Sequence, residues 1–226
     1  MTLGTRLFLR LFIALPILVA LVFIPAGTFR FWQGWALLAL AFIPSSVVFF
    51  YLYKHDPELI ARRLQTKEEV SEQKQLIRLL KPTFFLVFLL PGLDYRFGWT
   101  RNHLRAVPLW LELLAQALFL GGYLTVFWTL KVNSFAGRTI RVEPGQQVIS
   151  TGPYGLVRHP MYSGSILMFL SIPLILGSFI GLFAFALLIL IYVLRLLNEE
   201  KVLRQELPGY TEYCQRTRYR LIPYVW

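Results

Sequence analysis

The chain has 226 residues, of which 56% are hydrophobic and only 15% are charged, and its mean hydropathy is +0.56. An average soluble domain carries about 25% charged residues, so this composition excludes a soluble globular protein. The aromatic content of 16% also excludes a disordered chain, because disordered segments are poor in aromatic residues. The composition therefore predicts an integral membrane protein.

The net charge of +11 comes from 23 basic and 12 acidic residues. In a soluble chain this excess would suggest a nucleic-acid partner, but in a membrane protein basic residues orient the spans, so we expect no nucleic acid. The single cysteine, Cys214, excludes an internal disulfide and a cysteine-rich metal site. The three histidines lack the spacing of zinc ligands, and no metal is expected.

Apolar segments that could cross a bilayer recur along the chain. A spanning helix needs about 20 mostly apolar residues, and residues 7–24, 31–53 and 107–130 each supply such a run. Residues 83–93 are apolar over only 11 positions, so they would span only if their helix begins before Pro82. This third segment decides whether the bundle has five or six transmembrane helices.

The longest apolar stretch, residues 161–197, is interrupted by Gly177 and Gly181. We interpret it as a helical hairpin with a tight turn, in which these glycines reverse the chain. In the preceding span, Gly121 and Gly122 are candidates for close contact with a neighbouring helix. The sequence thus predicts an all-α, polytopic membrane bundle with a C-terminal helical hairpin.

With six spans, both termini lie on one side of the membrane. Eighteen basic residues then fall on that side, in the N-terminal segment, the loops 54–81 and 131–158, and the tail, against four on the other side. This bias predicts that the side is cytoplasmic. We divide the chain into residues 1–130, the N-terminal transmembrane helices with a cytoplasmic loop at 54–81, and residues 131–226, which carry the chemistry. We expect a bacterial inner membrane, with the endoplasmic reticulum as the alternative.

Polar residues gather at the two ends that the hairpin brings together. One end has the sequence GPYGLVRHPMYSG over residues 152–164, and the other carries Arg195, Glu199 and Glu200. Pro160 suits the first turn of a helix, where free N–H groups attract an anion. Gly164, one turn further on, is expected to leave room beside the helix for a flat or bulky ligand group.

The side chains at these two ends match the groups of one cofactor. Glu199 and Glu200 can bind hydroxyls or an ammonium, and Arg195 can bind a carboxylate. Tyr154 and Tyr162 can contact an aromatic base or a cationic centre. S-adenosylmethionine carries all of these groups. Taken singly, the same residues also suit structural roles as helix-end ion pairs, caps or interfacial anchors.

The same motifs resemble a known family. The residues that carry the resemblance are Gly152-Pro153-Tyr154, the pattern RHPxYxG at 158–164, Glu199-Glu200, and a tail with Tyr210, Tyr213 and Ile222-Pro223. They are similar to the isoprenylcysteine carboxyl methyltransferase family, which is related to the phospholipid N-methyltransferases. The resemblance covers residues 133–223. At residues 207–209 this chain has Leu-Pro-Gly where the family usually has Phe-Gly, so the tail departs from the pattern.

The resemblance implies a membrane methyltransferase that depends on S-adenosyl-L-methionine and acts at the cytoplasmic face on a lipophilic carboxylate acceptor. It places Arg195 near that carboxylate. If the acceptor is an amine instead, Glu199 would serve as the base. The cofactor-binding residues expected from the two arguments together are Gln146, Gln147, Val148, Ile149, Tyr154, His159, Pro160, Met161, Tyr162, Gly164 and Glu200.

Other functions stay open at this point. The first is N-methylation of a phospholipid or another amine. The second is a sterol-type membrane reductase, whose phosphorylated nicotinamide cofactor could bind Arg138, Arg141 and Arg158. A small transporter is disfavoured, because only Glu112 falls inside an expected span and no internal repeat is visible. A soluble-type dinucleotide fold is also disfavoured, because no GxGxxG motif occurs.

Overall fold

The computed structural model describes residues 3–65, 68 and 71–226, and every regular element in this part of the chain is helical. Residues 66, 67, 69 and 70 of the predicted 54–81 loop lie outside the described residues. The long helices are α1 (Leu3–Ala26), α2 (Trp32–His55), α4 (Ser71–Phe97), α6 (Leu109–Val132), α7 (Pro160–Ile175) and α8 (Gly181–Glu206). The short helices are α3 (Pro57–Leu64), α5 (Trp99–His103), the 3-10 helix η1 (Gly152–Gly155) and α9 (Tyr210–Arg216).

The predicted polytopic helical bundle is confirmed. Four helices, α2, α4, α6 and α8, are long and apolar enough to cross a membrane, and α1 and α7 contain shorter apolar stretches. The uncertain segment 83–93 belongs to α4, which begins at Ser71 and so continues through Pro82. The condition for a third span is therefore met.

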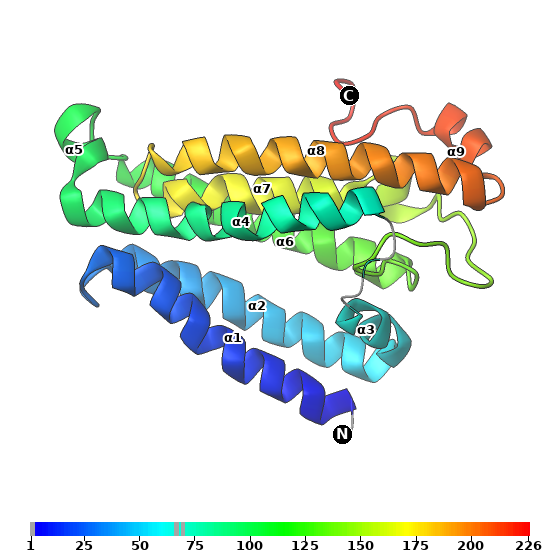
Figure 1. The fold of residues 1–226 in the computed structure, drawn as a ribbon, viewed down its shortest axis with the longest axis horizontal. Helices are drawn as coiled ribbons and strands as arrows, with labels where there is room; N and C mark the ends of the chain where they lie inside the picture. Colours follow the sequence, from blue (N-terminus) through cyan, green and yellow to red (C-terminus); the bar gives the residue numbers. More distant parts are fainter. Residues whose placement is uncertain (1–2, 66–67, 69–70) are drawn as a thin grey trace.

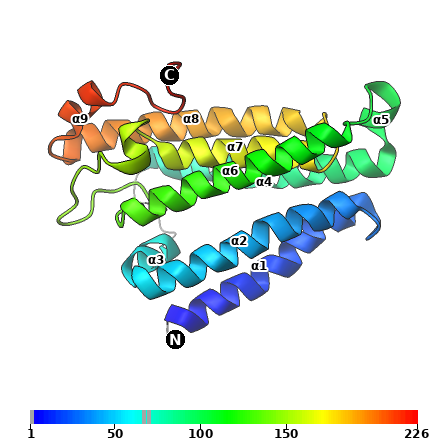
Figure 2. The ribbon, with the colours of Figure 1, turned by 180° about the vertical axis from the view of Figure 1, so that it is seen from behind.

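The helices form two layers (Figure 1). Helices α4, α6, α7 and α8 make one group, and α1 and α2 lie against it, as the reverse view also shows (Figure 2). Buried side chains such as Val22, Leu37, Val87, Ile175 and Leu188 fill the space between the two layers. Helices α3 and α9 lie at the same end of the bundle as the start of α1, and α5 lies at the other end. An even number of spans likewise places the first and last elements at the same end.

Helices α7 and α8 form the predicted hairpin. The chain reverses between Ile175 and Gly181, and Gly177 has a φ of +69°, a left-handed conformation that glycine adopts readily. The expectation that these glycines reverse the chain is confirmed. At this end of the bundle, buried Asp94 accepts a hydrogen bond from the backbone of Thr100 (2.6 Å) and from the hydroxyls of Thr100 and Ser178. These bonds hold the hairpin turn against α4 and α5.

Gly122 and Gly164 place α6 and α7 in direct backbone contact. A Cβ placed at Gly122 would lie 2.6 Å from the carbonyl oxygen of Gly164, and a Cβ at Gly164 would lie 2.6 Å from that of Gly122. The expected close contact at Gly122 is confirmed, whereas Gly121 has nothing within 4 Å and makes no such contact. The expectation that Gly164 leaves room for a ligand is wrong, because α6 fills that space.

Candidate functional site

The start of α7 is covered by the C-terminal tail. Helix α7 begins at Pro160 as expected. The backbone N–H groups of Arg158 and His159 donate to the carbonyl oxygens of Tyr219 (2.8 Å) and Arg220 (3.0 Å). One turn further on, Ser163 Oγ donates to the carbonyl oxygen of Leu221 (2.7 Å). The tail therefore takes up the backbone amides of Arg158 and His159, which precede the first turn of α7.

Glu200 is the buried centre of this arrangement, with 4% of its surface exposed. Its Oε1 accepts a hydrogen bond from Arg158 Nε (2.7 Å) and lies 3.3 Å from His159 Nε2, and its Oε2 accepts from Arg220 Nε (3.0 Å). Both oxygens thus already have partners from the protein. A cofactor hydroxyl or ammonium would have to share or replace one of these bonds.

Glu199, the neighbouring acid, is more open. Its Oε2 accepts a hydrogen bond from the Tyr162 hydroxyl (2.7 Å), while its Oε1 lies 3.9 Å from His159 Nδ1, beyond hydrogen-bonding distance. The Glu199 side chain is 25% exposed. Of the two neighbouring acids, Glu199 therefore offers a carboxylate oxygen that a ligand can reach without displacing a protein donor.

Tyr154 lies in the 3-10 helix η1. Asn133 Nδ2 donates to its hydroxyl (2.7 Å), and the Tyr213 hydroxyl donates to its carbonyl oxygen (2.8 Å). Burial raises the pKa of Tyr154 to about 12; the Asn133 hydrogen bond opposes this shift, the negative charge of Glu199 adds to it, and the positive charge of Arg63 opposes it. The hydroxyl is thus neutral near pH 7, and it lies within electrostatic reach of both Glu199 and Arg63.

The four loop residues expected at the cofactor differ in their surroundings. Gln146 accepts a hydrogen bond from the backbone N–H of Glu143 (2.9 Å) and so closes its own turn. Val148 packs into the cluster that also contains Tyr154 and the buried residues of α9. Gln147 is exposed, and Ile149 is partly buried. The structure therefore brings Val148 to the neighbourhood of Tyr154 and leaves the Gln147 side chain in solvent.

Arg195 is engaged with α4 and with the loop before η1. Its Nη1 donates to Gln73 Oε1 (3.2 Å), and its Nη2 donates to the carbonyl oxygen of Arg138 (2.9 Å) and lies 3.6 Å from Glu68 Oε2. Its ion-pair partner among the described residues is thus Glu68, rather than Glu199 four positions further along the helix. Arg195 ties α8 to the start of α4 and to the loop before η1.

Arg63 is a basic residue near the site whose importance the sequence reasoning missed. Asp56 caps α3 by accepting from the backbone N–H of Leu59 (2.9 Å), and Leu59 and Ile60 are buried. Arg63 follows these two residues by four and three positions, so it lies on the same inward face of the helix. Its Nη1 donates to the carbonyl oxygen of Ala136 (3.0 Å) and contacts Met161 Sδ (3.3 Å). The amphipathic spacing after Asp56-Pro57 was the signal that could have identified it.

A cavity of about 350 Å³ lies beside Arg63, between α2, α3, α6, α7 and α8. The residues that line it are Ser45, Val48, Phe49, Leu52, Ile60, Arg63, Leu64, Tyr123, Val126, Phe127, Leu130, Ser165, Met168, Phe169 and Tyr192. Arg63 is the charged member of this set. The volume of the cavity is at the lower end of the range of about 300–1,000 Å³ for small-molecule sites.

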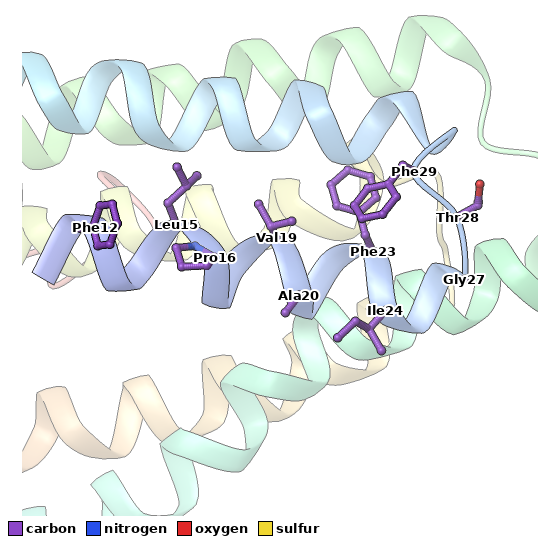
Figure 3. A pocket seen from close by; sticks show the side chains of 10 residues that line it. All are labelled: Phe12, Leu15, Pro16, Val19, Ala20, Phe23, Ile24, Gly27, Thr28 and Phe29. Atoms are coloured by element: carbon purple, nitrogen blue, oxygen red, sulfur yellow. The ribbon is translucent and has the colours of Figure 1, made fainter. Parts of the chain in front are cut away.

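A larger hollow of about 770 Å³ follows α1 and the turn after it. Figure 3 shows its lining: Phe12, Leu15, Pro16, Val19, Ala20, Phe23, Ile24, Gly27, Thr28 and Phe29. This lining contains no ionisable group, whereas ligand sites combine apolar walls with a few placed polar groups. We therefore place the candidate site at the end of the bundle that carries Glu199.

Comparison with known proteins bears on the same region. A profile of the family described as phospholipid methyltransferase matches residues 110–208, which include α6, η1, α7 and α8. This match supports the coarser part of the resemblance: the region is similar to a membrane methyltransferase family related to the isoprenylcysteine carboxyl methyltransferases. The carboxyl specificity itself stays a prediction.

A relative of different activity also matches. The mouse (Mus musculus) protein named Delta(14)-sterol reductase TM7SF2 is 36% identical over 102 residues. The match covers 41% of this chain and 23% of that protein, so the two share less than a quarter of the relative's length. The apolar helices and the membrane family match together support a multi-pass integral membrane protein. The two matches differ in the reaction that their names describe, methyl transfer or reduction.

Proposed function

We propose that the protein is a membrane methyltransferase that binds S-adenosyl-L-methionine between the start of α7, the 3-10 helix η1 and Glu199 on α8. The observation that carries the proposal is Glu199: its Oε1 is open, its Oε2 accepts a hydrogen bond from Tyr162, its charge acts on Tyr154, and it lies within the region similar to the phospholipid methyltransferases. A carboxylate with a free oxygen in a site that also contains tyrosines suits a ligand that has hydroxyls, an ammonium and a cationic centre.

The residues present fit this cofactor. When bound, it supplies a methyl group on a positively charged sulfonium. Glu199 accepts a hydrogen bond from a ligand hydroxyl or ammonium, and the rings of Tyr154 and Tyr162 contact its flat and cationic parts. Glu200 holds Arg158, His159 and the tail in place through its three contacts. Glu200 therefore positions the site, whereas Glu199 contacts the ligand.

The acceptor is a lipophilic molecule that enters laterally from the bilayer. A carboxylate acceptor is ionised near neutral pH and needs no base, so the protein has only to align it with the methyl group and exclude water. Arg195 contributes to this alignment by holding α8 against Gln73 and the loop before η1. An amine acceptor would need a base, and Glu199 is the carboxylate with a free oxygen for that role.

Calorimetry on the purified protein in detergent tests the cofactor. We expect the demethylated product, S-adenosylhomocysteine, to bind with micromolar affinity and NADPH not to bind. Incubation of proteoliposomes with a radiolabelled methyl donor, followed by lipid extraction, then tests the acceptor, and we expect label in the lipid fraction. Binding of NADPH alone would overturn the methyltransferase proposal, and transfer only to water-soluble molecules would overturn the lipophilic acceptor.

A sterol-type reductase is the second candidate, and the match to the mouse reductase supports it. Its cofactor phosphates would bind Arg138, Arg141 and Arg158. However, Arg158 is buried against Glu200, and Arg141 pairs with Glu143 (2.7 Å) and Gln65 (2.6 Å). Two of the three arginines are thus already in use, which favours methyl transfer. The same calorimetry separates the two functions.

A further inference from the structure

Arg63 and the cavity beside it are not used by the cofactor site. The cavity walls are mainly apolar side chains of α2, α6 and α7, such as Phe49, Phe127 and Met168, and Arg63 supplies the charge. No ion pair joins Arg63 to an acidic group within the part of the chain that the structure describes. The positive charge of Arg138 repels the Arg63 guanidinium.

The surroundings of Arg63 would favour the binding of an anion. Burial lowers the pKa of the Arg63 guanidinium, and the positive charge of Arg138 lowers it further. Within the described ranges, the partners of its Nη1 are the Ala136 carbonyl and the Met161 sulfur. Arg63 is partly buried, and removing a charge from water, even in part, without an opposite charge costs free energy. A ligand carboxylate would form a bidentate pair with this guanidinium and remove that cost.

We propose that the cavity binds a single-chain lipophilic acid, with its carboxylate at Arg63 and its chain between α2, α6 and α7. The volume of about 350 Å³ suits one chain rather than the two of a diacyl lipid. The head group would lie next to Met161 in the first turn of α7, and near Tyr154, whose hydroxyl is within electrostatic reach of both Arg63 and Glu199.

This placement gives the acceptor carboxylate a partner other than Arg195, whose guanidinium already faces Glu68. Arg63 therefore sets the specificity for an acid, and the cavity sets the preference for one chain. That the bound acid is the methyl acceptor rests on the proposed function. Binding of the acid does not, so the two can fail separately.

Photo-crosslinking tests the binding. The probe is palmitic acid with a diazirine near the chain end, added to the purified protein in phosphatidylcholine vesicles, and the labelled residues are identified by mass spectrometry. We expect label on Phe49, Phe127 or Phe169. The yield should fall about tenfold in Arg63→Gln and change by less than about twofold in the matched control Arg78→Gln, whose side chain is exposed on α4, because only Arg63 forms a charged hydrogen bond with the acid.

Two further variants keep the test decisive if Arg63→Gln folds poorly. Arg63→Lys keeps the charge and should retain most of the label, and Ser165→Phe fills the cavity and should abolish it. Equal labelling by a diazirine-bearing hexadecanol, labelling confined to the α1 hollow, or wild-type yield in Arg63→Gln would each overturn the proposal. If palmitate labelling depends on Arg63 but no S-adenosylhomocysteine binds, the proposed function fails and this site stands.

Discussion

Arg158, two residues before α7, and Glu200, near the end of α8, form a 2.7 Å ion pair in which each side chain is only 5% exposed. Arg220 of the tail reaches the other oxygen of the same carboxylate. One acid thus joins three segments that are far apart in the sequence. Because removal of one partner leaves the other charges buried, the structure at this end of the bundle depends on Glu200.

Glu200→Gln should therefore destabilise the protein by about 3–5 kcal/mol, the usual effect of breaking a buried ion pair. The buried Cys214 on α9 provides the measurement, since a thiol-reactive fluorescent dye labels it only as this region unfolds on heating. Glu206→Gln on the same helix is the matched control, because that side chain is exposed. Equal melting temperatures for the two variants would contradict the role given to Glu200.

Glu199→Gln should act on the cofactor rather than on stability. Its carboxylate makes one hydrogen bond to Tyr162 and is partly exposed, so the melting temperature should stay close to wild type. Loss of a charged hydrogen bond to the ligand should weaken binding of S-adenosylhomocysteine about tenfold, or about 1.5 kcal/mol. Calorimetry at a temperature where both the wild type and Glu199→Gln are folded measures this affinity. Unchanged affinity in Glu199→Gln would assign the ligand contact elsewhere.

The contact between α6 and α7 predicts opposite effects for two neighbouring glycines. Gly122→Ala would place a methyl group 2.6 Å from the carbonyl oxygen of Gly164, and we expect a loss of about 1–3 kcal/mol as the helices move apart. Gly121→Ala meets nothing within 4 Å and should stabilise the helix by about 0.5–1 kcal/mol. Thermal unfolding of both variants checks the pair, and a similar change in both would show that the helices are not in close contact.

The bundle and its hairpin could be predicted because apolar run length and turn residues are local signals. Pro82 does not shorten the helix that contains residues 83–93, because proline is tolerated within a span. This helix, α4, begins eleven residues before Pro82, at Ser71. Gly164 was misassigned for a different reason. The sequence shows that residue 164 is a glycine and so leaves space beside the helix. Only the packed structure shows whether a ligand or another helix, here α6, fills that space.

The candidate site could be predicted only in part. The motif around residues 158–164 and the pair at 199–200 do lie together, because a hairpin brings its ends side by side. The contact between Arg220 and Glu200 depends on how the tail folds back, which no spacing indicates. Arg63 comes from an 8-residue helix almost one hundred positions before Met161, and only the tertiary fold brings the two within 3.3 Å.

At the opposite end of the bundle, Glu112 on α6 is 5% exposed and accepts a long hydrogen bond from Gln33 Nε2 (3.4 Å). Glu112 Oε2 and Gln33 Oε1 have no hydrogen-bond partner among the described residues. Two buried acceptors without donors are costly, and a negative charge on Glu112 adds to that cost.

Glu112→Gln has nearly the same shape but supplies an amide donor for Gln33 Oε1, so that the two side chains can form a reciprocal amide pair. We expect it to stabilise the protein by about 1 kcal/mol, the typical net worth of one hydrogen bond. Glu112→Ala, which leaves both groups of Gln33 without a partner, should destabilise it. Melting temperatures of the two variants, followed through Cys214, test this order. A lower melting temperature for Glu112→Gln than for wild type would mean that the carboxylate of Glu112 is needed in its charged form.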